Sequence, residues 1–125
     1  MIEDRIQKIV TDREWLTNWL SDAFYGSPWF EVKTAYIPLS RVPAKLSPCR
    51  EDRWAEALLN GGYIIVYDPE AEEEHRIDLK AILKGFEKFI FDCPEQYANM
   101  MIGNYDFLDA DCLLQIVVFG EVTYA

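Results

Sequence analysis

The sequence predicts an α+β fold: a small antiparallel sheet of about three strands packed with four to five helices. Two observations predict it. Apolar residues recur at helical spacing in five segments, and short runs rich in aromatic and β-branched residues lie between them. With 125 residues, 50% of them hydrophobic, the chain is expected to form one globular domain over residues 1–125.

The first predicted helix begins at Thr11 or Asp12, which are both good N-cap residues, and ends before Pro28. Its apolar stripe consists of Trp15, Leu16, Trp19, Leu20, Ala23 and Phe24. A strand is expected over residues 29–37, since aromatic and β-branched residues are frequent there. The alternating positions are Phe30, Val32, Thr34 and Tyr36. Prolines then mark a loop that reaches Pro48.

A second helix is predicted over residues 51–60, where two glycines follow the apolar stripe. The stripe consists of Trp54, Ala55, Leu58 and Leu59. The continuous apolar run 63–67 indicates a buried strand. A turn begins at Asp68 and the chain returns through residues 75–79, which predicts a hairpin with an acidic tip.

Asp78 is expected to cap a third helix over residues 79–91. Its predicted face consists of Leu79, Ile82, Leu83, Phe86 and Ile90. Pro94 interrupts this helix and suits the first position of a short helix that reaches Ile102.

Asp109 is expected to cap a last helix over residues 110–119, which should be the most buried one because few of its residues are polar. The β-branched content of residues 116–124 leaves a strand as the alternative. Asp111 and Gln115 lie four residues apart in this apolar helix, so we expect them to be hydrogen-bonded and to fix its orientation.

The charge of the chain is one-sided. Residues 62–125 contain 13 acidic and four basic residues, and no Lys or Arg follows Lys88, whereas residues 1–61 are nearly balanced. The formal net charge is -10. Such a charge disfavours direct contact with nucleic acid or an anionic membrane, and it favours a partner with a basic surface.

No apolar run approaches the length of a membrane-spanning helix, and the acidic first residues do not resemble a secretory signal. The three cysteines are odd in number and widely spaced, which argues against a disulfide framework. We therefore expect a cytoplasmic protein with reduced thiols.

A zinc site could combine Cys49, Cys93 and Cys112 with His75, but none of the usual close ligand pairs is present. A cysteine nucleophile activated by His75 is also weakly indicated, because this histidine is expected in a solvated turn. Buried structural thiols are the simpler interpretation.

Asp106, Asp109 and Asp111 could hold a cation through their oxygens, but the order of ligands in an EF-hand is absent. Capping of the last helix explains the same residues. The sequence therefore predicts no metal, no other cofactor and no enzymatic activity.

Several segments carry a resemblance to a known family. They are Trp54–Tyr63, the strand and hairpin that end at Leu79, Gly85-Phe86, Asp106–Asp111, Leu114-Gln115, and Phe119-Gly120-Glu121 through to Tyr124. The pattern resembles small acidic proteins of unknown function that bacteriophages, prophages and related mobile elements encode. The phrase Leu20–Phe24 with Gly26 and Trp29 is similar to the N-terminal helix and turn of that family.

The resemblance implies a phage-derived protein in a bacterial cytoplasm, where small acidic proteins often block host defence nucleases or their DNA-binding complexes. We therefore expect a non-enzymatic inhibitor of a host nucleic-acid-binding defence complex, an anti-CRISPR or anti-restriction protein that acts as a DNA mimic. The expected partner-binding residues are Asp68, Glu70, Glu72, Glu73, Glu74, Asp106 and Asp109. The alternative is a self-associating structural or regulatory phage protein, a homodimer built on exposed aromatic residues around Trp29 and Tyr36.

Overall fold

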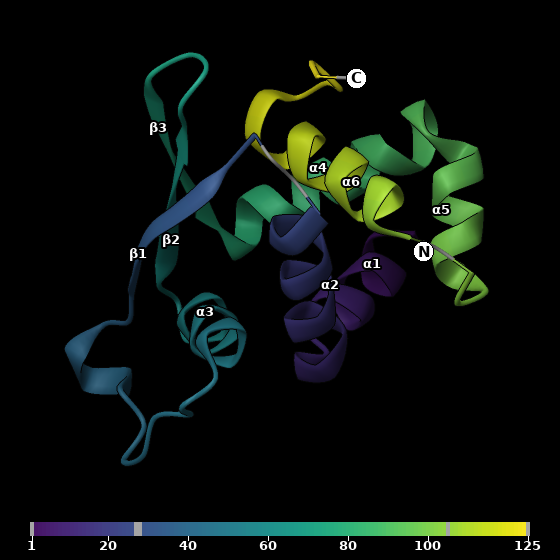
Figure 1. The fold of residues 1–125 in the computed structure, drawn as a ribbon. Helices are drawn as coiled ribbons and strands as arrows, with labels where there is room; N and C mark the ends of the chain where they lie inside the picture. Colours follow the sequence, from purple (N-terminus) through teal and green to yellow (C-terminus); the bar gives the residue numbers. More distant parts are fainter. Residues whose placement is uncertain (1, 27–28, 105, 125) are drawn as a thin grey trace.

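The computed structural model describes residues 2–26, 29–104 and 106–124, and these residues form the predicted α+β fold (Figure 1). The antiparallel sheet has the strand order β1-β2-β3. Its strands are β1 (Glu31–Tyr36), β2 (Tyr63–Asp68) and β3 (Glu73–Asp78). The helices are α1 (Ile2–Val10), α2 (Arg13–Gly26), α3 (Arg50–Leu59), α4 (Leu79–Asp92), α5 (Pro94–Met101) and α6 (Phe107–Phe119), and a 3-10 turn, η1, covers Leu39–Arg41.

Helix α1 is the one helix that the sequence interpretation missed. Its apolar residues recur at helical spacing, and of these Ile6 and Val10 are buried against the core. Of the two N-cap candidates, Asp12 caps α2, because its Oδ1 accepts a hydrogen bond of 3.0 Å from the backbone N–H of Trp15. The Thr11 hydroxyl instead donates to the carbonyl oxygen of Gln7 in α1.

Among the described residues, one face of the central strand is buried and the other is half-buried. On β2, Ile64 and Val66 are buried, whereas the alternate residues are half-buried on the outer face. The prediction of a buried strand therefore holds for the inner face, and long side chains cover part of the outer face. The guanidinium of Arg76 lies 4.0 Å from the ring centre of Tyr63, for example.

Strand β1 is one of the two edge strands, and most of its residues are exposed. Its pairing with β2 shifts between Val32 and Thr34, so the predicted alternation of inward and outward residues is interrupted there. Phe30 is buried and Val32 half-buried, but Thr34 and Tyr36 are exposed.

Helix α6 lies between α2, α4 and α5 and is the most buried helix, as predicted. It begins earlier than expected, because Asp106 is its N-cap and accepts hydrogen bonds from the N–H groups of Leu108 and Asp109. The Asp109 side chain in turn accepts a hydrogen bond from the N–H group of Asp106. This is a capping box, so the prediction of Asp109 as the cap is wrong by three residues. The helix extends to Phe119, which rules out the strand alternative over that part.

Two close backbone approaches require glycine. A Cβ atom at Gly85 in α4 would lie 2.6 Å from Cγ2 of Val117 in α6, so these helices pack in near backbone contact. A Cβ atom at Gly62 would lie 1.7 Å from the carbonyl oxygen of Tyr36. Gly61, at φ +81°, ends α3, and the N–H of Gly62 reaches back to the carbonyl oxygen of Ala57.

Candidate functional site: the acidic hairpin

The acidic hairpin, residues 68–74, contains the most concentrated charge of the chain. Glu70, Glu72, Glu73 and Glu74 are all exposed. Figure 1 shows that the turn between β2 and β3 stands clear of the helical ribbons. Glu72 has a φ of +55°, the one positive φ of a non-glycine residue among the described residues, so the turn is sharp. The structure thus brings four of the predicted site residues together at one tip.

Asp68 does not belong to the exposed set. Its relative exposure is 0%, and both of its oxygens are hydrogen-bonded inside the protein. Oδ1 accepts bonds from the N–H groups of Glu70 (2.9 Å) and Ala71 (3.3 Å), and Oδ2 accepts a bond of 2.8 Å from the hydroxyl of Tyr124. The expectation that Asp68 contacts a partner is therefore corrected: it shapes the turn that carries the glutamates.

Tyr124 joins the C-terminal segment to the hairpin. Its ring stacks on Trp29 at 4.7 Å between ring centres and meets Phe119 edge-on at 5.8 Å. The hydrogen bond to Asp68 is the main reason that the pKa of Tyr124 is raised to about 12. The alternative in which Trp29 anchors a second copy is weakened, because its ring already packs against Tyr124.

Gln115 holds the same segment from the core side. Its side-chain oxygen accepts bonds from the N–H groups of Thr123 (2.8 Å) and Tyr124 (2.7 Å). Its nitrogen donates to Oδ2 of Asp111 (2.8 Å) and to the carbonyl oxygen of Tyr124 (3.1 Å). The predicted hydrogen bond between Asp111 and Gln115 is confirmed, and the pair also fixes the chain after α6, which the sequence did not indicate.

Asp106 and Asp109 are separated from the hairpin. They lie at the first turn of α6, whereas the far end of this helix contacts the sheet through Phe119 and His75. A helix of 13 residues is about 20 Å long, so the first turn is distant from the sheet. Asp109 is 9% exposed and burial raises its pKa. Neither residue joins the glutamates in one surface, a point that the sequence left open. Asp106 is exposed at this separate place, whereas Asp109 is buried and offers little surface to a partner.

The four glutamates do not form a flat row. Neighbouring residues of a strand point to opposite faces, so Glu73 and Glu74 diverge. The Glu73 carboxylate lies 3.7 Å from Nε2 of His75. On the other face, Glu74 contributes to the raised pKa of Lys33, although the hydrogen bond to Glu31 is the larger cause. The hairpin therefore presents negative charge in several directions around its tip.

His75 is half-buried and does not occupy the solvated position that we expected. Its ring meets Phe119 edge-on at 5.4 Å, and Nε2 is buried without a hydrogen-bond partner. Cys49 is exposed before α3, while Cys93 and Cys112 are half-buried beside other helices. Burial raises the pKa of Cys112 to about 11, which makes it a poor nucleophile. Within residues 2–26, 29–104 and 106–124, no group of three His, Cys, Asp or Glu side chains could hold a metal ion.

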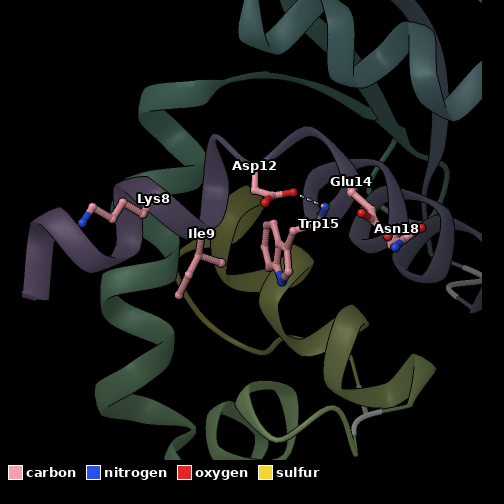
Figure 2. Close-up of a pocket in the computed structure, with 6 residues that line it drawn as sticks. All are labelled: Lys8, Ile9, Asp12, Glu14, Trp15 and Asn18. Atoms are coloured by element: carbon pink, nitrogen blue, oxygen red, sulfur yellow. Dashed lines mark hydrogen bonds between the residues drawn. The ribbon is translucent and has the colours of Figure 1, made fainter.

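A hollow of about 450 Å³ between α1 and α2 is a second, weaker candidate site (Figure 2). It is lined by Lys8, Ile9, Asp12, Glu14, Trp15 and Asn18. Trp15 provides an aromatic surface, stacked on Trp19 at 5.9 Å, and Figure 2 shows the Asp12 carboxylate directed at the Trp15 backbone nitrogen. The lining charges are of both signs and include no nucleophile paired with a base, so the hollow suggests no reaction.

Comparison of the chain with protein-family models, curated proteins and solved structures finds no match. None of the helices in the described part of the chain combines the length and apolar character needed to cross a bilayer. The function is therefore inferred from the charge and geometry of the hairpin.

Proposed function

We propose that this protein is a non-enzymatic, acidic binding protein of phage or mobile-element origin that inhibits a host nucleic-acid-binding defence complex. In this proposal it acts in the bacterial cytoplasm as an anti-CRISPR or anti-restriction protein. It occupies a basic surface of the complex with its acidic hairpin. The observation that carries the proposal is the exposure of four glutamates on one ordered turn.

The order of the turn matters for affinity. Asp68 bonds to two N–H groups of the turn, and Tyr124 holds Asp68 from the other side. The backbone that carries the carboxylates is thus organised before binding, which lowers the conformational entropy that association costs. A flexible acidic tail of the same charge would lack this advantage.

Charge determines which partner fits. Duplex DNA carries one negative charge per roughly 1.7 Å of its axis, so proteins that bind it present a basic groove. The hairpin tip places four exposed carboxylates close together, so it can offer negative charge to several cationic groups of such a groove. Attraction of this kind accelerates association and weakens with salt.

The test replaces the four hairpin glutamates, Glu70, Glu72, Glu73 and Glu74, by Gln, which removes charge and keeps size. Binding of the full chain to purified restriction and CRISPR complexes is then measured at low and high salt. We expect the wild type to bind at low salt and the substituted protein to bind at least ten-fold more weakly. This corresponds to about 1.4 kcal/mol.

A matched control replaces four exposed glutamates outside the hairpin, Glu14, Glu87, Glu95 and Glu121, by Gln. It changes the net charge by the same amount, so it separates the hairpin from overall charge. Equal losses in both variants, or binding that neither salt nor the hairpin substitutions change, would contradict the proposal.

A further inference from the structure

Helix α4 carries three lysines in line, Lys80, Lys84 and Lys88, which we call the lysine stripe. Together with Arg76 they are all the basic residues after Gly61. Residues four apart share one side of a helix, and all three are exposed. A chain with a net charge of -10 thus keeps a local basic surface.

The stripe is largely unpaired within the molecule. Lys88 forms an ion pair of 3.4 Å with Asp92, whereas neither Lys80 nor Lys84 has an ion pair with another described residue. Lys84 and Lys88 line a hollow with Phe119 and Gly120 at the C-terminal end of α6, where the helix dipole favours positive charge. Lys80 is not among the residues that line this hollow.

The shape around the stripe suits a protruding segment. A hollow of about 360 Å³ lies on one side of Lys84, with Ile6 and Leu83 among its lining residues. The other hollow, of about 300 Å³, lies on the opposite flank between α4 and α6. Lys84 lines both of them, so the stripe is bordered by two depressions that a turn could enter. The first also contains one acid, Glu87, beside Lys80 and Lys84.

The chain itself carries a segment of complementary charge. The acidic hairpin exposes four glutamates at its tip. None of them forms an ion pair with a lysine of the stripe. Strand β3 has six residues and separates the hairpin tip from the start of α4 by about 20 Å, so the two surfaces do not meet within one molecule. The stripe spans about 12 Å of helix, which matches the extent of a short turn.

We propose that the lysine stripe binds the acidic hairpin of a second copy of this chain. The proposal does not depend on the function proposed above, although both use the hairpin. Contacts between exposed charges are individually weak, so the association is concentration-dependent and salt-sensitive. A consequence is that self-association covers the hairpin and competes with binding to a basic partner.

Sedimentation equilibrium of the full chain tests the contact. At about 20 mM salt and high protein concentration, we expect an average mass above the monomer value of 14.6 kDa. At about 1 M salt, where the screening length is about 3 Å, we expect the monomer. A wild type that remains monomeric at low salt, or an association that high salt does not weaken, would overturn the proposal.

Two charge-reversed variants make the test specific. One carries E70K, E72K, E73K and E74K, and the other carries K80E, K84E and K88E. Each alone should be monomeric at low salt, and an equimolar mixture should associate again because each supplies the surface that the other lacks. Circular dichroism verifies that both fold. A mixture that does not associate, or a stripe variant that still self-associates, contradicts the contact.

A control with K8E, R41E and K45E reverses three exposed charges elsewhere and should still self-associate at low salt. The stripe variant also distinguishes this proposal from the proposed function, because its hairpin is intact. It should lose self-association and keep its binding to a basic defence complex. If the hairpin variant loses binding to the defence complex, that result tests the proposed function. It does not test the contact of the lysine stripe with a second copy.

Discussion

The hydroxyl of Tyr124 donates a hydrogen bond of 2.8 Å to the buried carboxylate of Asp68, a residue 56 positions earlier in the chain. The same carboxylate accepts two backbone bonds from the turn that follows it. The buried Asp68 carboxylate therefore connects the C-terminal segment to the acidic hairpin. The shape of the proposed binding surface depends on its bonds to the turn and on its bond to Tyr124.

Replacement of Asp68 by Ala should destabilise the protein. It removes three hydrogen bonds at a fully buried position, for which about 1–3 kcal/mol of unfolding free energy is expected. Urea denaturation followed by circular dichroism measures it. The control Glu70→Ala, at an exposed position, should change stability by less than about 0.5 kcal/mol. Equal effects would show that Asp68 does not organise the turn.

Alkaline pH should release the C-terminal segment. The pKa of Tyr124 is raised from 10.0 to about 12 in the folded protein, so the folded state binds this proton more tightly than the unfolded state. The resulting stability is complete below pH 10 and is lost as the pH rises through about 12. Ultraviolet absorbance should show one late-titrating tyrosine, which is absent from Tyr124→Phe. A spectrum without this late step would contradict the assignment.

Replacement of Gln115 by Leu should free the segment after α6 while keeping the volume of the side chain. It leaves the N–H groups of Thr123 and Tyr124 without their acceptor, and we expect a loss of about 1–3 kcal/mol. Hydrogen exchange should show faster exchange at these two amides. As a control, amide exchange within α3 should be unchanged, and protection retained at Thr123 would argue against the proposed anchor.

Gly85→Ala should destabilise the contact between α4 and α6. The added methyl group would meet Val117, and overpacking of this kind costs about 1–3 kcal/mol, more than the helix propensity gained. Thermal unfolding measures the loss. The double variant Gly85→Ala with Val117→Ala should recover only part of it, because the Val117 Cα also lies 2.9 Å away. Full stability of the single variant would mean that the helices separate easily.

Much of the fold could be predicted from local patterns. These patterns involve residues that are close together in the chain. They are the apolar stripes of α2, α3 and α4, the interruption at Pro94 and the N-cap of α4 at Asp78. The hairpin was predicted for the same reason, since its strands are adjacent in the chain. Helix α1 was missed although Ile2, Ile6, Ile9 and Val10 recur at helical spacing, so this error is one of reading and not of a missing signal. The start of α6 was misplaced because Asp106 and Asp109 both suit a cap, and only the backbone geometry shows their capping box.

The sequence by itself determined the elements and the one-sided charge, because helical periodicity, turn residues and ionisable groups are properties of short segments. The tertiary structure alone decided which acids are available to a partner. Asp68 and Glu70 are two residues apart, yet one is buried and the other is exposed. Burial of Asp68 is possible because Tyr124, distant in the chain, supplies a hydrogen bond to its carboxylate, and no local pattern reports such a partner.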